Sequence, residues 1–140
     1  MNLRNASILI IDDDQDDLDV IKEAIAEFDS SILSISFIYP REAVRVICNE
    51  LIALPDYIFT DINMPLMAGD ECLKQLRSNK LLNDTIITVL STSIPVNFSM
   101  KLKEMGADYT FQKPPNIAGY KDILTTVFQT ELGPRGTLKL

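Results

Sequence analysis

Five short apolar runs alternate along this chain with stretches whose apolar residues recur at helical spacing. The runs cover residues 7–11, 32–38, 57–60, 86–90 and 109–112. Repeated strand–helix units favour a parallel sheet with helices on both faces, because each crossover helix packs back onto the sheet. With 140 residues, the chain has the length of one domain. The sequence therefore predicts one α/β domain with a doubly wound sheet of five strands.

Five helical segments connect or follow these strands. We predict helices that start near Asp16, follow Pro40, run from about Asp70 to Asn79, lie between Pro95 and Gly106, and start near Asn116. Apolar spacing predicts the inward residues of the first two helices: Leu18, Ile21, Ile25 and Phe28, then Val44, Ile47, Cys48 and Leu51. We interpret both cysteines, Cys48 and Cys72, as apolar filler. In the run 32–38, apolar residues alternate with serines, as expected of an outer strand.

Polar residues stand where four of the apolar runs end. Asp12 and Asp13 close the first run, Asp61 the third, Ser91 the fourth and Lys113 the fifth. The carboxyl ends of parallel strands share one edge of the sheet, where ligand sites form. At an effective dielectric constant near 20, two carboxylates about 5 Å apart repel by roughly 3 kcal/mol, which favours a raised pKa or a bound cation. Oxygen ligands in an open site suit Mg²⁺.

The local motifs and their spacing resemble the receiver domain of bacterial two-component response regulators. Ser91 follows Asp61 by 30 residues, and Lys113 follows Ser91 by 22. The motifs are Ile8-Leu9-Ile10-Ile11-Asp12-Asp13-Asp14, Asp61-Ile62-Asn63-Met64-Pro65, Gly69, Leu90-Ser91-Thr92, Gly106-Ala107-Asp108 and Lys113-Pro114. The resemblance extends from about Ser7 to about Leu132.

The resemblance implies a flavodoxin-like fold with strand order 2-1-3-4-5. Residues 1–132 would form the receiver domain and residues 133–140 a short frayed tail, with no output domain. The chain would be a stand-alone phosphoacceptor rather than an enzyme, although it would catalyse its own phosphorylation and dephosphorylation. It contains no histidine, so the phosphoryl donor would be a partner histidine kinase or histidine phosphotransfer protein.

The resemblance also assigns a role to each site residue. Asp61 would be the nucleophile and a Mg²⁺ ligand. Asp13 would bind Mg²⁺ directly, Asp12 mainly through water, and the backbone carbonyl of Asn63 would supply a further ligand. Ser91 would donate a hydrogen bond to the phosphoryl group. Lys113 would neutralise its oxygens.

Three positions depart from the family pattern. Ala68 stands where the family often has Asp, and Pro115 follows Pro114. Thr110 replaces the aromatic residue that turns inward when receivers are phosphorylated. Since Tyr109 and Phe111 point to the opposite face of the strand, we hypothesise that coupling runs through Ser91 and the loop 92–95. The output face would comprise the fourth helix, the fifth strand and the fifth helix.

Other interpretations of these residues stay open at this point. Asp12, Asp13 and Asp14 could satisfy a helix dipole, and Ser91 and Lys113 could be ordinary strand-end residues; we take Asp14, Asp16 and Asp17 as a helix cap or solvated face. A pseudo-receiver would keep the fold without phosphorylation. Asp12-x-Asp14 also resembles the nucleophile motif of haloacid-dehalogenase-type phosphatases, but the later acidic metal motif of those enzymes is not matched after Lys113.

Charge and apolar patterning exclude several classes of function. The net charge is −7, with 13 basic and 20 acidic residues, which argues against nucleic acid and anionic membranes as partners. The first residues lack the apolar core of a signal peptide. No apolar run approaches the ~20 residues of a spanning helix. We therefore expect a cytoplasmic protein.

Overall fold

The computed structural model describes residues 6–62, 69–92 and 96–129. Its strands are β1 (Ser7–Ile11), β2 (Leu33–Phe37), β3 (Tyr57–Asp61), β4 (Ile86–Ser91) and β5 (Tyr109–Gln112). Its helices are α1 (Gln15–Phe28), α2 (Pro40–Cys48), α3 (Gly69–Ser78), α4 (Val96–Glu104) and α5 (Ile117–Phe128). A 3₁₀ turn, η1 (Lys80–Leu82), precedes β4 and was not expected from the sequence.

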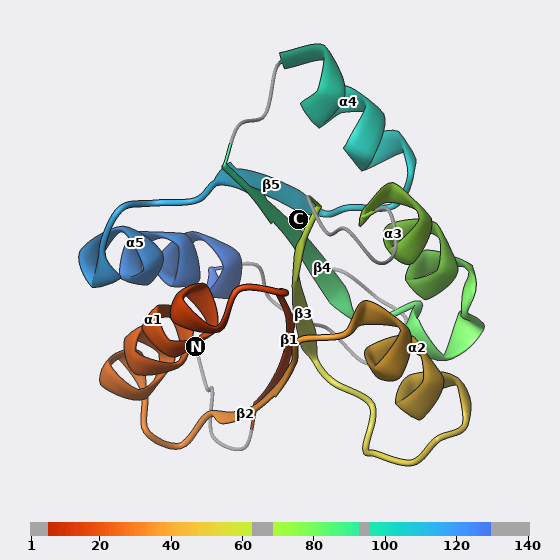
Figure 1. Cartoon of the computed structure of the whole chain (residues 1–140), viewed down its shortest axis with the longest axis horizontal. Coiled ribbons are helices and arrows are strands. Elements are labelled where there is room, and N and C mark those ends of the chain that lie inside the picture. Colours follow the sequence, from red (N-terminus) through yellow and green to blue (C-terminus); the bar gives the residue numbers. More distant parts are fainter. Residues whose placement is uncertain (1–5, 63–68, 93–95, 130–140) are drawn as a thin grey trace.

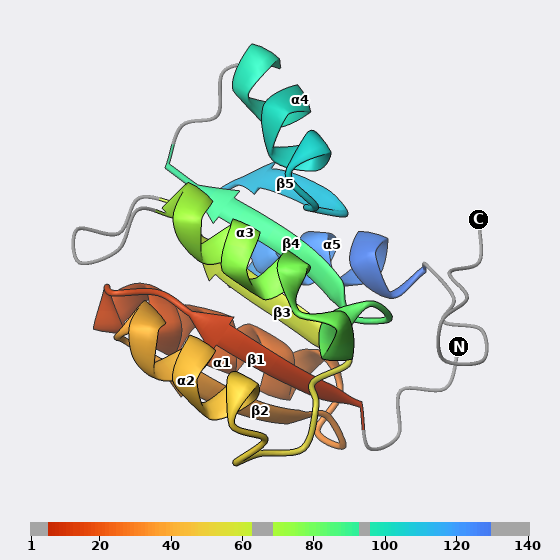
Figure 2. The same cartoon turned by 90° about the vertical axis from the view of Figure 1, so that its right-hand side faces the viewer.

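The five strands form one parallel sheet in the order β2-β1-β3-β4-β5. Figure 2 shows the strands running in one direction, so their carboxyl ends lie along the same edge. The predicted fold class and strand order are confirmed. No helix among the described residues is long and apolar enough to cross a membrane.

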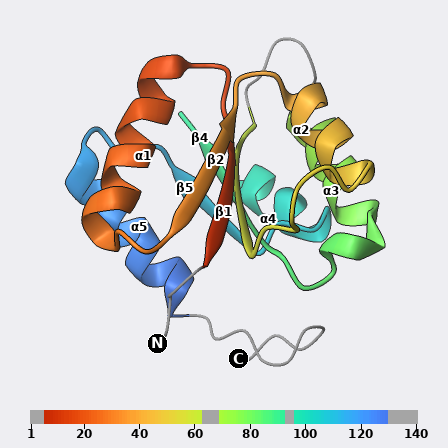
Figure 3. The same cartoon turned by 90° about the horizontal axis from the view of Figure 1, so that it is seen from below.

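Helices cover both faces of the sheet. Helices α1 and α5 lie on one face, and α2, α3 and α4 lie on the other (Figure 1, Figure 3). Successive side chains of a strand point to opposite faces, so Ile8 and Ile10 join the core beneath α1 and α5, whereas Leu9 and Ile11 join the other core. Burial on both faces explains why β1, β3 and β4 read as continuous apolar runs.

The partly buried side chain of Arg77 links several segments on the α3 side of the sheet. Its guanidinium donates to the carbonyl oxygens of Gly106 at 2.9 Å, Leu82 at 3.1 Å and Thr85 at 3.2 Å. It also forms an ion pair with Asp108 at 2.9 Å. Asp108 in turn accepts from the backbone N–H of Ile87 at 2.8 Å. Arg77 thus connects α3 with the chain that leads into β4 and with the chain that leads into β5.

The α2 region differs from the sequence-based expectation. Ala43, Val46 and Ile47 face the core, whereas Cys48 is exposed and Leu51 is 58% exposed. The helix ends at Cys48 and Glu50 takes a φ of 54°, so Leu51 lies beyond the helical periodicity. The interpretation of Cys48 as filler is therefore wrong, while Cys72 is buried as expected.

Strand β2 is the outer strand that the serine alternation predicted, but its apolar side chains are not covered. Leu33 is 62% exposed and Ile35 is 41% exposed. Only Phe37, at the end of the strand, packs against the α2-side core. The first half of β2 therefore presents bulky apolar side chains to solvent.

Candidate functional site

Four strands deliver the site residues to one edge of the sheet. Strand register places Ile11 beside Thr60, Asp61 beside Leu90, and Ser91 beside Gln112. Asp12, one residue beyond β1, is thereby aligned with Asp61, and Lys113 directly follows the strand partner of Ser91. The backbone N–H of Lys113 donates to the carbonyl oxygen of Ser91 at 2.7 Å, which extends the β4–β5 pairing to the site.

Three carboxylates form the centre of this site. Asp12, Asp13 and Asp61 each offer an oxygen, and these oxygens all lie within 4.8 Å of one another. Asp12 and Asp61 are buried, while Asp13 is half-buried. We call these three residues the carboxylate cluster. The structure thus brings together the three aspartates that the sequence assigned to one site.

Local hydrogen bonds fix the position of Asp12. Its backbone N–H donates to the carbonyl oxygen of Phe37 at 3.1 Å. Its Oδ1 accepts from the backbone N–H of Asp14 at 2.9 Å, and its Oδ2 pairs with Lys113 Nζ at 2.9 Å. Both carboxylate oxygens of Asp12 therefore already have a protein partner. Burial nevertheless raises the pKa of this carboxyl to about 6.

The Lys113 ammonium contacts three carboxylates from three different segments. Its Nζ lies 2.7 Å from Asp17 Oδ2, 2.9 Å from Asp12 Oδ2 and 3.2 Å from Asp61 Oδ2. Burial opposes the charged form of the ammonium, but the bonds to Asp17 and Asp12 outweigh it, so the pKa of Lys113 is raised. Lys113 is therefore a fixed positive charge that touches the cluster.

Helix α1 begins beside this ammonium because Asp14 caps it. Asp14 Oδ1 accepts from the backbone N–H groups of Asp16 at 2.9 Å and Asp17 at 3.4 Å, which confirms the cap interpretation for Asp14. Asp17, expected to be a cap or solvated residue, instead forms the shortest ion pair of Lys113. The sequence could have indicated this contact. Asp17 is the third residue of a helix capped by Asp14, and side chains of a helix point back toward its N-terminus.

The remaining predicted site residues are placed as follows. Ser91 is fully buried at the end of β4, and Thr92 after it is exposed. Asn63, the predicted backbone ligand, and Ala68 lie outside the described residues, as does the loop 93–95. Thr110 lies in β5, where its hydroxyl is 2.6 Å from that of Ser99 in α4.

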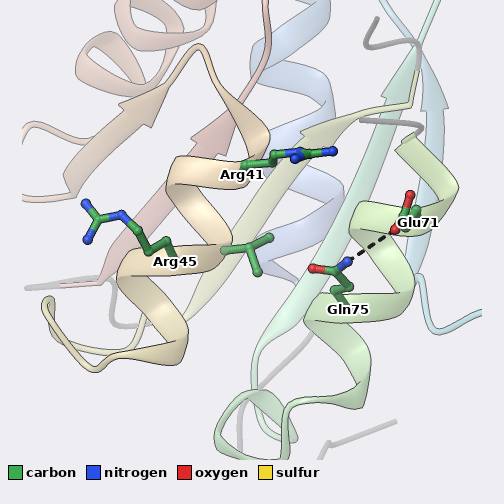
Figure 4. Close-up of a pocket in the computed structure, with 5 residues that line it drawn as sticks. Arg41, Arg45, Glu71 and Gln75 are labelled. Carbon is green, nitrogen blue, oxygen red and sulfur yellow. Dashed lines mark hydrogen bonds between the residues drawn. The ribbon is translucent and has the colours of Figure 1, made fainter. Parts of the chain in front are cut away.

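A hollow lies between α2 and α3, away from the carboxylate cluster. It is lined by Arg41, Val44, Arg45, Glu71 and Gln75. Figure 4 shows Arg41 extending toward α3, while Arg45 turns away from it and pairs with Glu42 at 2.7 Å. The hollow shares no residue with the carboxylate cluster, so we do not assign it a part in the chemistry of the cluster.

A family model and a curated relative match most of the chain. The model of the response regulator receiver domain matches residues 8–125. Stress response regulator protein 1 of Candida tropicalis is 28% identical over 122 residues, which cover 82% of this chain and 42% of that protein. The chain spans less than two thirds of the length of the curated relatives that it matches.

Solved structures resemble the fold over nearly its whole length. The chemotaxis response regulator CheY4 of Vibrio cholerae has a TM-score of 0.75 at 26% identity, covering 88% of this chain and 98% of its own. The Mn²⁺-bound form of response regulator Rcp1 has a TM-score of 0.78 at 20% identity, covering 96% and 99%. These matches agree with the parallel five-stranded sheet of the chain.

Proposed function

The chain belongs to the response regulator receiver domain family, and on that premise we propose that it accepts a phosphoryl group on Asp61 and thereby switches its contacts with other proteins. The observation that carries the proposal is the surrounding of Asp61. This carboxylate ends the central strand β3, belongs to the carboxylate cluster and lies 3.2 Å from Lys113 Nζ. The proposed nucleophile, two further carboxylates and the Lys113 ammonium therefore lie together at the carboxyl edge of the sheet.

The phosphoryl transfer needs little covalent chemistry from the protein. A carboxylate oxygen of Asp61 would form the new bond to phosphorus as the bond from phosphorus to the donor nitrogen breaks, and the donor imidazole keeps that electron pair. Such reactions depend mainly on positioning and charge neutralisation. This chain has no histidine, so the donor histidine would belong to a histidine kinase or phosphotransfer protein.

The donor set of the carboxylate cluster fits Mg²⁺, which prefers oxygen ligands and retains several waters. Asp13 and Asp61 would bind the ion directly. Asp12 would act mainly through water, a role supported by the partners that both its oxygens already have. The carbonyl of Asn63 stays a prediction, since it lies outside the described residues. When bound, Mg²⁺ would supply positive charge to the phosphoryl oxygens, and the Mn²⁺-bound form of Rcp1 supports a divalent ion in this fold.

Ser91 and Lys113 would complete the site. The Lys113 ammonium would turn its Asp61-facing donor to the phosphoryl oxygens, because phosphorylation removes the negative charge of the Asp61 carboxylate and places it on those oxygens. Ser91, buried at the end of β4, would donate a hydrogen bond to the same group. The protein would thereby catalyse its own phosphorylation and dephosphorylation without being an enzyme for another substrate.

The signal would leave through protein–protein contacts. We propose that the domain passes the signal through the face formed by α4, β5 and α5. The net charge of −7 disfavours nucleic acid as the direct partner. The downstream target would instead be a protein that binds the phosphorylated form.

The first prediction tests the acceptor. Acetyl phosphate with Mg²⁺ should label the chain once, and Asp61→Asn should abolish the label, as mass spectrometry of the intact protein would show. Asp16→Asn, an exposed change of the same kind, should leave labelling intact. A label that persists in Asp61→Asn contradicts the assignment, a label that maps to Asp12 favours the phosphatase alternative, and an unlabelled wild-type chain favours a pseudo-receiver.

A further inference from the structure

The shortest ion pair at the site involves a carboxylate that is not in the carboxylate cluster. Lys113 Nζ is 2.7 Å from Asp17, against 2.9 Å to Asp12 and 3.2 Å to Asp61. A lysine ammonium has three donors, and here each donor has one carboxylate. Asp12 and Asp61 belong to the carboxylate cluster, whereas Asp17 reaches the ammonium from the first turn of α1.

The three carboxylate partners of Lys113 differ in how far their side chains are exposed to solvent. The side chains of Asp12 and Asp61 are 2% and 5% exposed, and that of Lys113 is 9% exposed. The Asp17 side chain is 34% exposed. Asp17 is therefore the most solvent-exposed of the three carboxylate partners of the buried ammonium.

The backbone holds Asp17 in this orientation. Asp14 caps α1 by accepting from the N–H of Asp17, and α1 is anchored to the core by Leu18 and Ile21. The partner on the other side, Lys113, is held by its backbone bond to Ser91. The ion pair thus joins two side chains whose backbones are both held by hydrogen bonds.

A cation at the carboxylate cluster changes what holds Lys113 in place. Asp12 and Asp61 would then share their negative charge with the cation, and the cation would repel the ammonium. Asp17 is the carboxylate partner of Lys113 that lies outside the cluster. Its attraction to the ammonium therefore persists when the attraction of the other two is offset.

From this geometry we propose that Asp17 is a positioning residue, which keeps the Lys113 ammonium beside Asp61 while the carboxylate cluster holds a divalent cation. The inference rests on the proposed phosphoryl acceptance at Asp61. Asp17 does not touch the phosphoryl group. It acts through Lys113, by retaining one donor of the ammonium so that another points at Asp61.

The test compares Asp17→Asn with Asp16→Asn, which removes the same charge from the same helical turn. Asp17→Glu serves as the conservative variant, because a longer carboxylate can still reach the ammonium. At saturating Mg²⁺, the rate of labelling by acetyl phosphate should fall about tenfold in Asp17→Asn, as expected for the loss of one charge-assisted hydrogen bond. The rate should stay within about twofold of wild type in Asp16→Asn, because an exposed charge there is largely screened, and Asp17→Glu should recover most of it.

A second readout does not depend on phosphorylation. The side-chain ammonium signal of Lys113 in ¹⁵N NMR should be protected from exchange in wild type, with and without Mg²⁺. In Asp17→Asn the protection should be lost when Mg²⁺ is added, while Asp16→Asn should behave as wild type.

Equal labelling rates in Asp17→Asn and Asp16→Asn, or a faster rate in Asp17→Asn, would overturn the inference. Retained ammonium protection in Asp17→Asn with Mg²⁺ would overturn it as well. If the wild-type chain is not labelled at all, the proposed function fails, and the ammonium signal alone then decides whether Asp17 holds Lys113.

Discussion

At the scale of single residues, Asp12 has the most consequential electrostatics. Burial raises the pKa of its carboxyl from 3.8 to about 6, although the Asp14 N–H and Lys113 favour the charged form. The folded protein therefore holds this proton at a higher pH than the unfolded chain does. The resulting contribution to stability is fully present below about pH 4 and is lost as the pH rises through about 6.

The second prediction follows from that sign. In metal-free protein, Asp12→Asn removes the titration of this carboxyl. When the pH is raised from 4.5 to 7.5, the free energy of unfolding of the variant should therefore increase relative to that of wild type. A shift of about two pKa units sets an upper limit of about 3 kcal/mol on this change. Urea denaturation with a chelator at both pH values measures it. A difference between the two proteins that is the same at both pH values contradicts the prediction.

Two buried threonines offer a matched pair for the third prediction. The hydroxyl of Thr85 donates to the carbonyl oxygen of Pro55 at 2.8 Å, whereas that of Thr88 has no hydrogen-bond partner within the described part of the chain. Thr88→Val should leave the free energy of unfolding unchanged or raise it by up to about 1 kcal/mol, because it removes an unsatisfied polar group. Thr85→Val should lower it by about 1–2 kcal/mol.

Urea denaturation of the two valine variants provides the comparison, and each serves as the control for the other. The chemical change is identical and both side chains are almost fully buried. If Thr88→Val destabilises the protein as much as Thr85→Val does, the difference in their hydrogen bonding has no energetic consequence.

At the scale of elements, α4 is attached to β5 by a pair of hydroxyl groups. Ser99 and Thr110 are 2.6 Å apart, and Thr110 occupies the strand position at which the family resemblance would place an aromatic ring. Tyr109 and Phe111 stack on each other at 6.0 Å and pack against the α1–α5 core, on the other face of the strand. Neither ring lies on the α4 side, which is consistent with coupling that does not use an aromatic rotation.

The fourth prediction is that Ser91 has a larger effect than Thr110 on the response of α4. Beryllofluoride should change the NMR shifts of α4 in wild type and in Thr110→Ala, while Ser91→Ala should reduce these changes severalfold. The reason is that Ser91 would contact the phosphoryl group, whereas the Thr110 hydroxyl contacts only that of Ser99 among the described hydrogen bonds. Dominant shift changes at Tyr109 or Phe111, or loss of the response in Thr110→Ala, would refute the hypothesis.

At the scale of the whole molecule, the site was more predictable than the details of packing. The alternation of strands and helices places Asp12, Asp61, Ser91 and Lys113 at one edge whatever the helix boundaries are, because parallel strands share their carboxyl edge. The strand order came from the family resemblance, since periodicity does not specify which strands are neighbours.

Other features depend on details that a sequence pattern does not contain. The contact of Asp17 with Lys113 depends on the exact start of α1, which the Asp14 cap determines. The exposure of Leu51 follows from the end of α2 at Cys48, whereas Cys48 is exposed because Ala43, Val46 and Ile47 form the inward face of the helix. For Asp17 and Leu51, a shift of one or two residues in a helix boundary decides which way the side chain points.

The uncovered half of β2 has a practical consequence for handling the protein. Its outer edge pairs with no other strand among the described residues, and the segment Leu33–Phe37 has no charged residue, proline or glycine. Edges of this kind let partly unfolded copies add to one another as cross-β ribbons. We therefore expect precipitation to begin at this strand in concentrated stocks and during slow heating. The substitution Leu33→Lys or Ile35→Lys should improve storage stability, because a charged side chain on the edge strand opposes this association.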